Sequence, residues 1–215
     1  MPSPLLRRLA AALAFAALAG AAEAQTGAIS LRADRQPLAQ AYGEAVAARV
    51  FSSALDAPRQ AALAASLQRV PGFSCGATPQ TALVAVFPWR GVRDRRAWIE
   101  RYQVACSPVA YRNLLMIEEG AGARAIELVP GRSNTDPQLQ RDLMTGIVAA
   151  AARHRPPNCA ETPVVTNVDL DAMEGQGAWR ETWHVSQCGK AAQAIRVGFS
   201  PSPQGGTTWR ISAGQ

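Results

Sequence analysis

Apolar positions along the chain change from helical spacing to strict alternation, and the chain makes this change twice. In the first half, apolar residues recur at helical spacing through residues 37–52 and again from Asp56-Ala-Pro58 to just before Pro71-Gly72. These two segments predict a helical hairpin. The β-rich or alternating runs that follow predict four strands, at residues 81–87, 98–106, 111–117 and 125–129.

The second half shows the same order of elements. Thr135-Asp136-Pro137 is typical of a helix start, and apolar residues then recur every four positions from Leu139 to Ala151 on one face. Four further strands are predicted at residues 164–170, 179–185, 195–199 and 207–211. The predicted fold class is α+β, with two tandem units that each consist of a helix and a four-stranded antiparallel sheet. Two sheets packed side by side in one continuous surface would fit this pattern.

Short motifs recur in the two halves and indicate an internal repeat. Residues 75–79 (CGATP) correspond to residues 159–163 (CAETP), and residues 98–106 (WIERYQVAC) correspond to residues 179–188 (WRETWHVSQC). Each copy of such a repeat is expected to be one structural unit. We divide the chain into a signal peptide at 1–24, an N-terminal extension and helical hairpin at 25–72, a first β-meander unit at 73–133, and a second helix plus β-meander unit at 134–215.

The repeat assigns the four cysteines to two equivalent pairs. In each unit, one cysteine precedes the first strand and the other lies at the end of the second, and these positions are neighbours at the open end of an antiparallel hairpin. We therefore predict the bridges Cys75–Cys106 and Cys159–Cys188. A four-cysteine zinc site is the alternative, but no C-x-x-C spacing supports it, and we expect neither a metal nor another cofactor. The extra residue before Cys188 requires either a β-bulge or a strand that ends at Ser186.

The most distinctive polar residues are two glutamates, each of which lies between two aromatic residues on one face of a predicted strand. One interpretation is a binding surface with aromatic walls and a carboxylate. The other is a buried sheet face, on which each glutamate needs a partner such as an arginine, because an unpaired buried carboxylate is costly. We favour the second interpretation, since both copies keep the pattern. The candidate binding residues are Trp98, Glu100, Tyr102, Trp179, Glu181 and Trp183.

The histidines do not complete a recognisable catalytic motif. His154 follows a predicted helix between two arginines, which fits a solvated position, and His184 faces away from Glu181 on its strand. A pair of Ser186 and His184 would place nucleophile and base two residues apart on one strand, without the sharp turn that nucleophilic serines use in α/β-hydrolases. No catalytic residue is therefore assigned.

The N-terminus predicts export. Arg7 and Arg8 precede an apolar stretch of about a dozen residues and a small-x-small site at Ala22-Glu-Ala24, which is typical of a secretory signal peptide. The stretch is shorter than the ~20 residues of a transmembrane helix, so we expect no transmembrane segment after cleavage and a periplasmic or secreted location. The formal net charge of +6 comes almost entirely from arginine. Because no basic run with interleaved aromatics is present, nucleic acid is not an expected partner.

The motif Trp179-x-Glu181-x-Trp183-x-Val185-x-x-Cys188-Gly189, followed by Phe199-x-Pro201, resembles one found in exported proteobacterial proteins without known activity. The resemblance implies a periplasmic family and carries no functional residues. At the level of fold only, tandem helix-plus-sheet units with one disulfide each are similar to bacterial β-lactamase inhibitory proteins. No motif supports the transfer of that function. From the duplicated aromatic strands and the missing catalytic constellation, we expect a non-enzymatic binding or envelope-associated protein whose partner is an unidentified protein or envelope ligand. A hydrolase-type enzyme and a secreted inhibitor of another protein are the alternatives.

Overall fold

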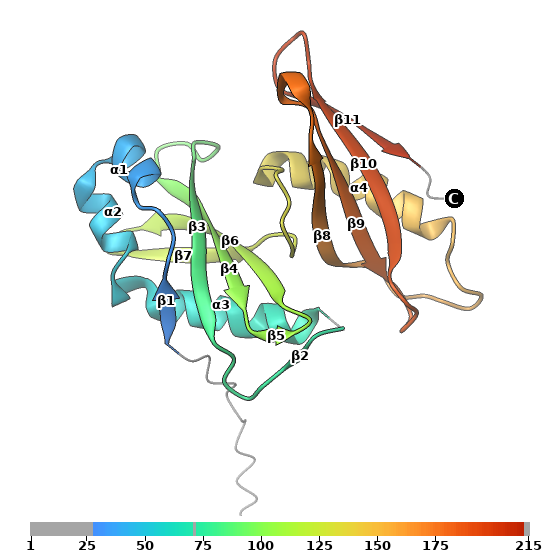
Figure 1. Ribbon diagram of the computed structural model, residues 1–215, viewed down its shortest axis with the longest axis horizontal. Coiled ribbons are helices and arrows are strands. Elements are labelled where there is room, and N and C mark those ends of the chain that lie inside the picture. The colour runs from blue at the N-terminus through green and yellow to red at the C-terminus, as the bar shows by residue number, and fades with distance from the viewer. Residues whose placement is uncertain (1–27, 71, 213–215) are drawn as a thin grey trace, which may run out of the picture.

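The computed structural model describes residues 28–70 and 72–212, and its elements form two lobes that lie side by side (Figure 1). The predicted signal peptide, residues 1–24, lies outside the described residues. The fold class is α+β, as predicted. No helix within the described ranges combines the length and the apolar character that a membrane crossing requires.

The first lobe consists of a five-stranded sheet, three helices and a small strand pair. Its helices are α1 (Gln36–Tyr42), α2 (Glu44–Val50) and α3 (Asp56–Arg69), and a short 3-10 turn, η1 (Ser53–Leu55), precedes α3. The sheet has the order β1-β3-β4-β6-β7, with β1 parallel to β3 and the other pairs antiparallel. The strands are β1 (Ile29–Leu31), β3 (Thr81–Trp89), β4 (Ala97–Val104), β6 (Ala110–Glu119) and β7 (Gly122–Glu127), and the separate pair is β2 (Ser74–Cys75) with β5 (Cys106–Ser107).

The segment 37–52 forms two helices where the apolar spacing predicts one. Helix α1 ends at Gly43, whose φ of 88° lies in the left-handed region that glycine favours, and α2 starts directly after it. The two helices then contribute Leu38 and Val50 to the same core, where α3 adds Leu63. This core covers one face of the sheet and explains why the spacing stays helical across the break.

The second lobe is a four-stranded antiparallel sheet with one long helix against one face. Helix α4 (Pro137–Ala152) begins where the side chain of Asp136 accepts a hydrogen bond from the Leu139 amide at 2.8 Å. The sheet has the order β11-β10-β9-β8, and its core is formed with α4 by side chains such as Leu143, Ile147 and Trp183. Its strands are β8 (Val164–Met173), β9 (Trp179–Ser186), β10 (Gln193–Pro201) and β11 (Thr207–Ser212), and a 3-10 turn, η2 (Gly175–Gly177), joins β8 to β9.

The two sheets remain separate, and the segment between β7 and α4 connects them. The Gly131 amide donates to the carbonyl of Tyr111 in β6 at 3.1 Å, and the next amide, that of Arg132, donates to the carbonyl of Val168 in β8 at 2.6 Å. The two sheets therefore do not form one continuous surface. Instead, the segment between β7 and α4 is bonded to a strand of each lobe.

Candidate functional site

Both predicted disulfides are confirmed. The bridges Cys75–Cys106 and Cys159–Cys188 have Cα–Cα distances of 4.2 and 5.9 Å, and all four cysteines are used. Strand β9 ends at Ser186, so the extra residue before Cys188 is accommodated by an early strand end rather than by a bulge. The alternative four-cysteine metal site is excluded, because its thiolates do not exist in the bridged chain.

The carboxylate of Glu100 is the centre of a buried polar cluster in the first lobe. Arg59 from α3 donates to it through Nε at 3.0 Å and through Nη2 at 2.6 Å, the Trp98 indole N–H donates at 2.8 Å, and the Tyr102 hydroxyl also donates. Burial lowers the pKa of Arg59, but the bonds and negative charge of Glu100 outweigh burial and raise it overall. Burial, followed by the charge of Glu100, raises the pKa of Tyr102. The cluster therefore holds a buried ion pair.

Glu181 occupies a similar position in the second lobe with a different set of donors. The indole N–H groups of Trp179 and Trp183 donate to its two oxygens at 3.0 and 2.9 Å, the Ser133 hydroxyl lies 3.0–3.1 Å from both, and the Asn134 amide donates at 2.6 Å. All of these donors are neutral. Burial therefore raises the pKa of Glu181 above its ordinary value, although the four donating groups oppose the shift.

The six candidate binding side chains consequently lie inside the two cores. Trp98, Glu100, Tyr102, Glu181 and Trp183 are fully buried and Trp179 is nearly so. In each lobe, the sheet face that carries these side chains is covered by helical structure. This is the buried sheet face that we favoured from the sequence. A ligand approaching the folded protein meets other residues.

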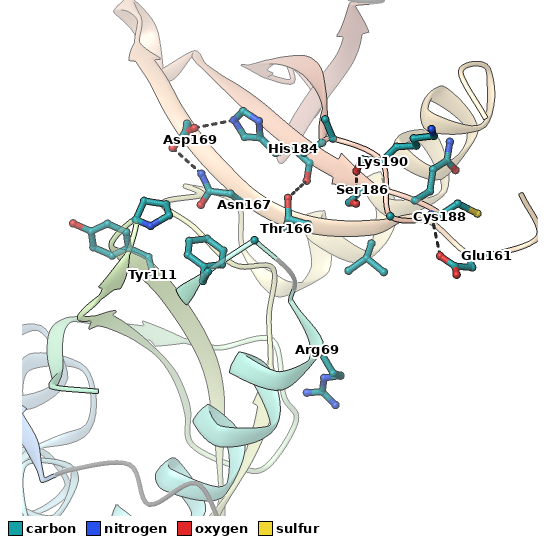
Figure 2. Close-up of a pocket in the computed structure, with 18 of the residues that line it drawn as sticks. Arg69, Tyr111, Glu161, Thr166, Asn167, Asp169, His184, Ser186, Cys188 and Lys190 are labelled. Carbon is teal, nitrogen blue, oxygen red and sulfur yellow. Dashed lines mark hydrogen bonds and ion pairs between the residues drawn. The ribbon is translucent and has the colours of Figure 1, made fainter. Parts of the chain in front are cut away.

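A cleft of about 990 Å³ lies between the lobes (Figure 2). One wall comes from the first lobe, and its apolar side chains are Phe73, Pro108, Val109 and Tyr111. The other wall is the face of the second sheet that points away from α4, together with the segment after β9. We call this hollow the interlobe cleft. Its volume falls within the range of small-molecule sites.

The second-lobe wall carries a connected set of polar side chains. His184 Nε2 lies 2.9 Å from one oxygen of Asp169, and the Asn167 amide donates to the other oxygen at 3.0 Å. Figure 2 shows these three side chains on the sheet side of the cleft, across from Tyr111. Ser186 also lies on this wall, but its hydroxyl donates to the Lys190 carbonyl at 3.0 Å. Because that proton is directed away from His184, the Ser186–His184 pair is not arranged for nucleophilic attack.

Charged and exposed apolar groups complete the cleft. Arg132 and Lys190 contribute positive charge and Asp169 and Glu161 negative charge, while Arg69 is paired with Glu127. The carboxylate of Glu161 accepts a hydrogen bond from the Cys188 amide at 2.9 Å. Val109 is 50 % exposed and Val164, on the opposite wall, is 41 % exposed. The site therefore offers apolar surface, hydrogen-bonding groups and charges of both signs to one ligand.

The residues of the cleft were not identified from sequence, apart from His184 and Ser186, which were considered and set aside. Alternation along β9 correctly places His184 on the sheet face opposite to that of Glu181. The same alternation along β8 would place Asp169 on the face that carries His184. Phe73 and Tyr111 carry no comparable signal, because they become part of a site only when the second lobe is placed against the first.

No protein-family model, curated protein or solved structure matches the chain.

Proposed function

We propose that this is an exported periplasmic protein with a non-enzymatic binding function, and that the interlobe cleft is its ligand site. The observation that carries the proposal is the cleft itself, in which Val109 and Val164 expose apolar surface from opposite lobes beside hydrogen-bonding groups. Few convergent polar groups on a largely apolar lining are the usual composition of a binding site.

We further propose that the two lobes are copies of one unit. Each sheet follows a helix, each is closed by one disulfide, and each buries a glutamate that accepts hydrogen bonds from the aromatic residues two positions before and after it. Duplication would then have provided two stable walls, and the cleft lies where they meet. Export is supported by the two disulfides, which persist in oxidising compartments.

Capture from a bacterial periplasmic extract tests the binding function. The immobilised full chain is compared with Val109→Glu and Val164→Glu, which place charge on the apolar walls, and with Met173→Glu as a matched control. Met173 is 61 % exposed and does not line the cleft. We expect wild type and Met173→Glu to retain the same ligand, detected by mass spectrometry, and the two wall variants to lose it. Equal retention by all four proteins would contradict the proposal.

Hydrolysis is the second candidate function, and the His184–Asp169 contact is the observation that favours it. A carboxylate bonded to one imidazole nitrogen fixes the tautomer and leaves the other nitrogen available as a general base. Chromogenic ester and amide substrates test this candidate. Turnover that disappears in His184→Ala, with unchanged folding by circular dichroism, would replace the binding function by an enzymatic one.

A further inference from the structure

Arg112, in strand β6, has a buried guanidinium that is only partly satisfied. Its side chain is 1 % exposed, and Nη1 donates to the Tyr111 carbonyl at 2.9 Å. Within the described residues, Nε and Nη2 have no hydrogen-bond partner. Burial without a partner lowers the pKa of Arg112, and the more distant charge of Glu127 only partly opposes this. A buried cation that lacks its hydrogen bonds is destabilising unless a partner is supplied.

The same core shows what a satisfied buried guanidinium looks like. Arg59 directs Nε and Nη2, the same two groups that are free in Arg112, to the two oxygens of Glu100. The nearby carboxylate of Glu127 does not play this part for Arg112, because it is bonded to Arg69. One edge of Arg112 is therefore a carboxylate-shaped donor pair without an acceptor.

Phe73 connects this guanidinium to the interlobe cleft. The Arg112 Cζ atom lies 4.8 Å from the centroid of the Phe73 ring, and Phe73 is itself part of the cleft wall. Tyr111, whose carbonyl accepts the one satisfied N–H of Arg112, also lines the cleft. The guanidinium of Arg112 thus packs against an aromatic ring that belongs to the cleft wall.

We infer that the ligand of the cleft carries a carboxylate, which displaces the Phe73 ring and binds the Nε and Nη2 groups of Arg112. This inference rests on the proposed binding function and names the ligand class of that site. Arg132 and Lys190 also place positive charge in the cleft lining, beside the carboxylates of Asp169 and Glu161. The ligand supplies the partner that the described residues do not provide for these two groups.

The donor arrangement selects a carboxylate over a phosphate. The edge of one guanidinium offers two parallel N–H groups, which match the two oxygens of a carboxylate. A phosphate would bring further charged oxygens into a buried place, and each oxygen beyond the two that face this pair of N–H groups would need a donor of its own.

Nuclear magnetic resonance of the Arg112 Nε–Hε group tests the inference on the full mature chain. Acetate, acetamide and inorganic phosphate are titrated at matched ionic strength, together with N-acetyl-trialanine as the free acid and as the amide. We expect the two carboxylates to shift the Arg112 signal and to bind about tenfold or more tightly than their amides. Tighter binding of the peptide acid than of acetate would identify a peptide C-terminus as the source, and equal affinity a small acid.

Two variants separate Arg112 from general electrostatics. Arg112→Met removes an unpaired buried charge, so it should keep or gain stability while losing the preference for carboxylates. Arg196→Met removes one exposed positive charge from β10, outside the cleft, and should keep that preference. Phe73→Ala should raise the affinity for acetate, because no ring has to be displaced.

An Arg112 signal that does not respond to acetate would overturn the inference, as would an equal response to phosphate or a carboxylate preference that survives Arg112→Met. The binding function fails separately, when the Val109→Glu and Val164→Glu variants still capture the ligand. If capture of a ligand depends on those valines but the ligand does not shift the Arg112 signal, the cleft remains the binding site and only the carboxylate inference is wrong.

Discussion

Replacing the Glu100 carboxylate by an amide should destabilise the first lobe strongly. Both oxygens of Glu100 are fully used: one accepts from Arg59 and Trp98, and the other from Arg59 and Tyr102. The amide of Glu100→Gln keeps the shape but turns one acceptor into a donor that faces other donors. It also leaves the buried charge of Arg59 with only the more distant and partly exposed carboxylate of Asp56, at 3.6 Å, as a counterion. Breaking a buried ion pair in this way costs about 3–5 kcal/mol.

That cost is a large part of a total folding free energy of about 5–15 kcal/mol. Urea unfolding, followed by tryptophan fluorescence and circular dichroism, measures it directly. Glu119→Gln is the control, because Glu119 pairs with Arg95 and Arg124 at the exposed surface and such pairs contribute about 0–1 kcal/mol. If Glu100→Gln costs no more than Glu119→Gln, the carboxylate does not organise this core.

A double-mutant cycle extends the same reasoning. Arg59→Met alone leaves the charge of Glu100 without its cation, whereas Arg59→Met with Glu100→Gln removes both charges. We therefore expect the double variant to be more stable than the sum of the two single losses implies, with a coupling of about 1–3 kcal/mol. Additive losses would show that the two side chains act independently.

Three further outcomes follow from the structure. Because burial raises the folded-state pKa of Glu181, the native state holds its proton more tightly than the unfolded chain. Stability should therefore fall as pH rises from the ordinary glutamate pKa of 4.5 through the folded pKa and then level off, and pH-dependent urea melts of Glu181→Gln should lack this fall. Gly131→Ala should destabilise the chain, because its Cβ would lie 2.2 Å from a carbonyl oxygen of β8 and the native φ is 100°, whereas Gly175→Ala, with open space around it, should cost little in the same melts. Replacing Cys159 and Cys188 together by alanine should cost about 3–4 kcal/mol in the chain-entropy description, measured by thermal unfolding with and without reductant.

Sequence reasoning predicted the parts of this fold that depend on neighbours along the chain. The cysteine positions at hairpin ends identified both bridges, and strand alternation placed Glu100 and Glu181 on faces that are buried. The break at Gly43 was missed because both helices keep the same apolar period, and the parallel pairing of β1 was missed because a three-residue strand has too little pattern to detect.

The partners of these residues could not be predicted, because they come from distant segments. Arg59, which is 41 residues from Glu100, and Ser133, which is 48 residues from Glu181, approach the carboxylates only after the helix and the interlobe segment have packed. The cleft depends still more on tertiary structure, since the angle between the lobes decides whether Phe73 faces His184 at all. Alternation can place a side chain on one face of a strand, but it does not say what lies across from that face.

The connectivity of the two bridges has a consequence for how the chain matures. The first cysteine pairs with the second and the third with the fourth, and each bridge closes within one lobe. A chain that enters an oxidising compartment N-terminus first presents its cysteines in the order in which they pair, so an oxidant that joins each thiol to the preceding free one produces the native bonds directly. We therefore expect oxidative refolding to need a thiol oxidant but little help from a disulfide isomerase.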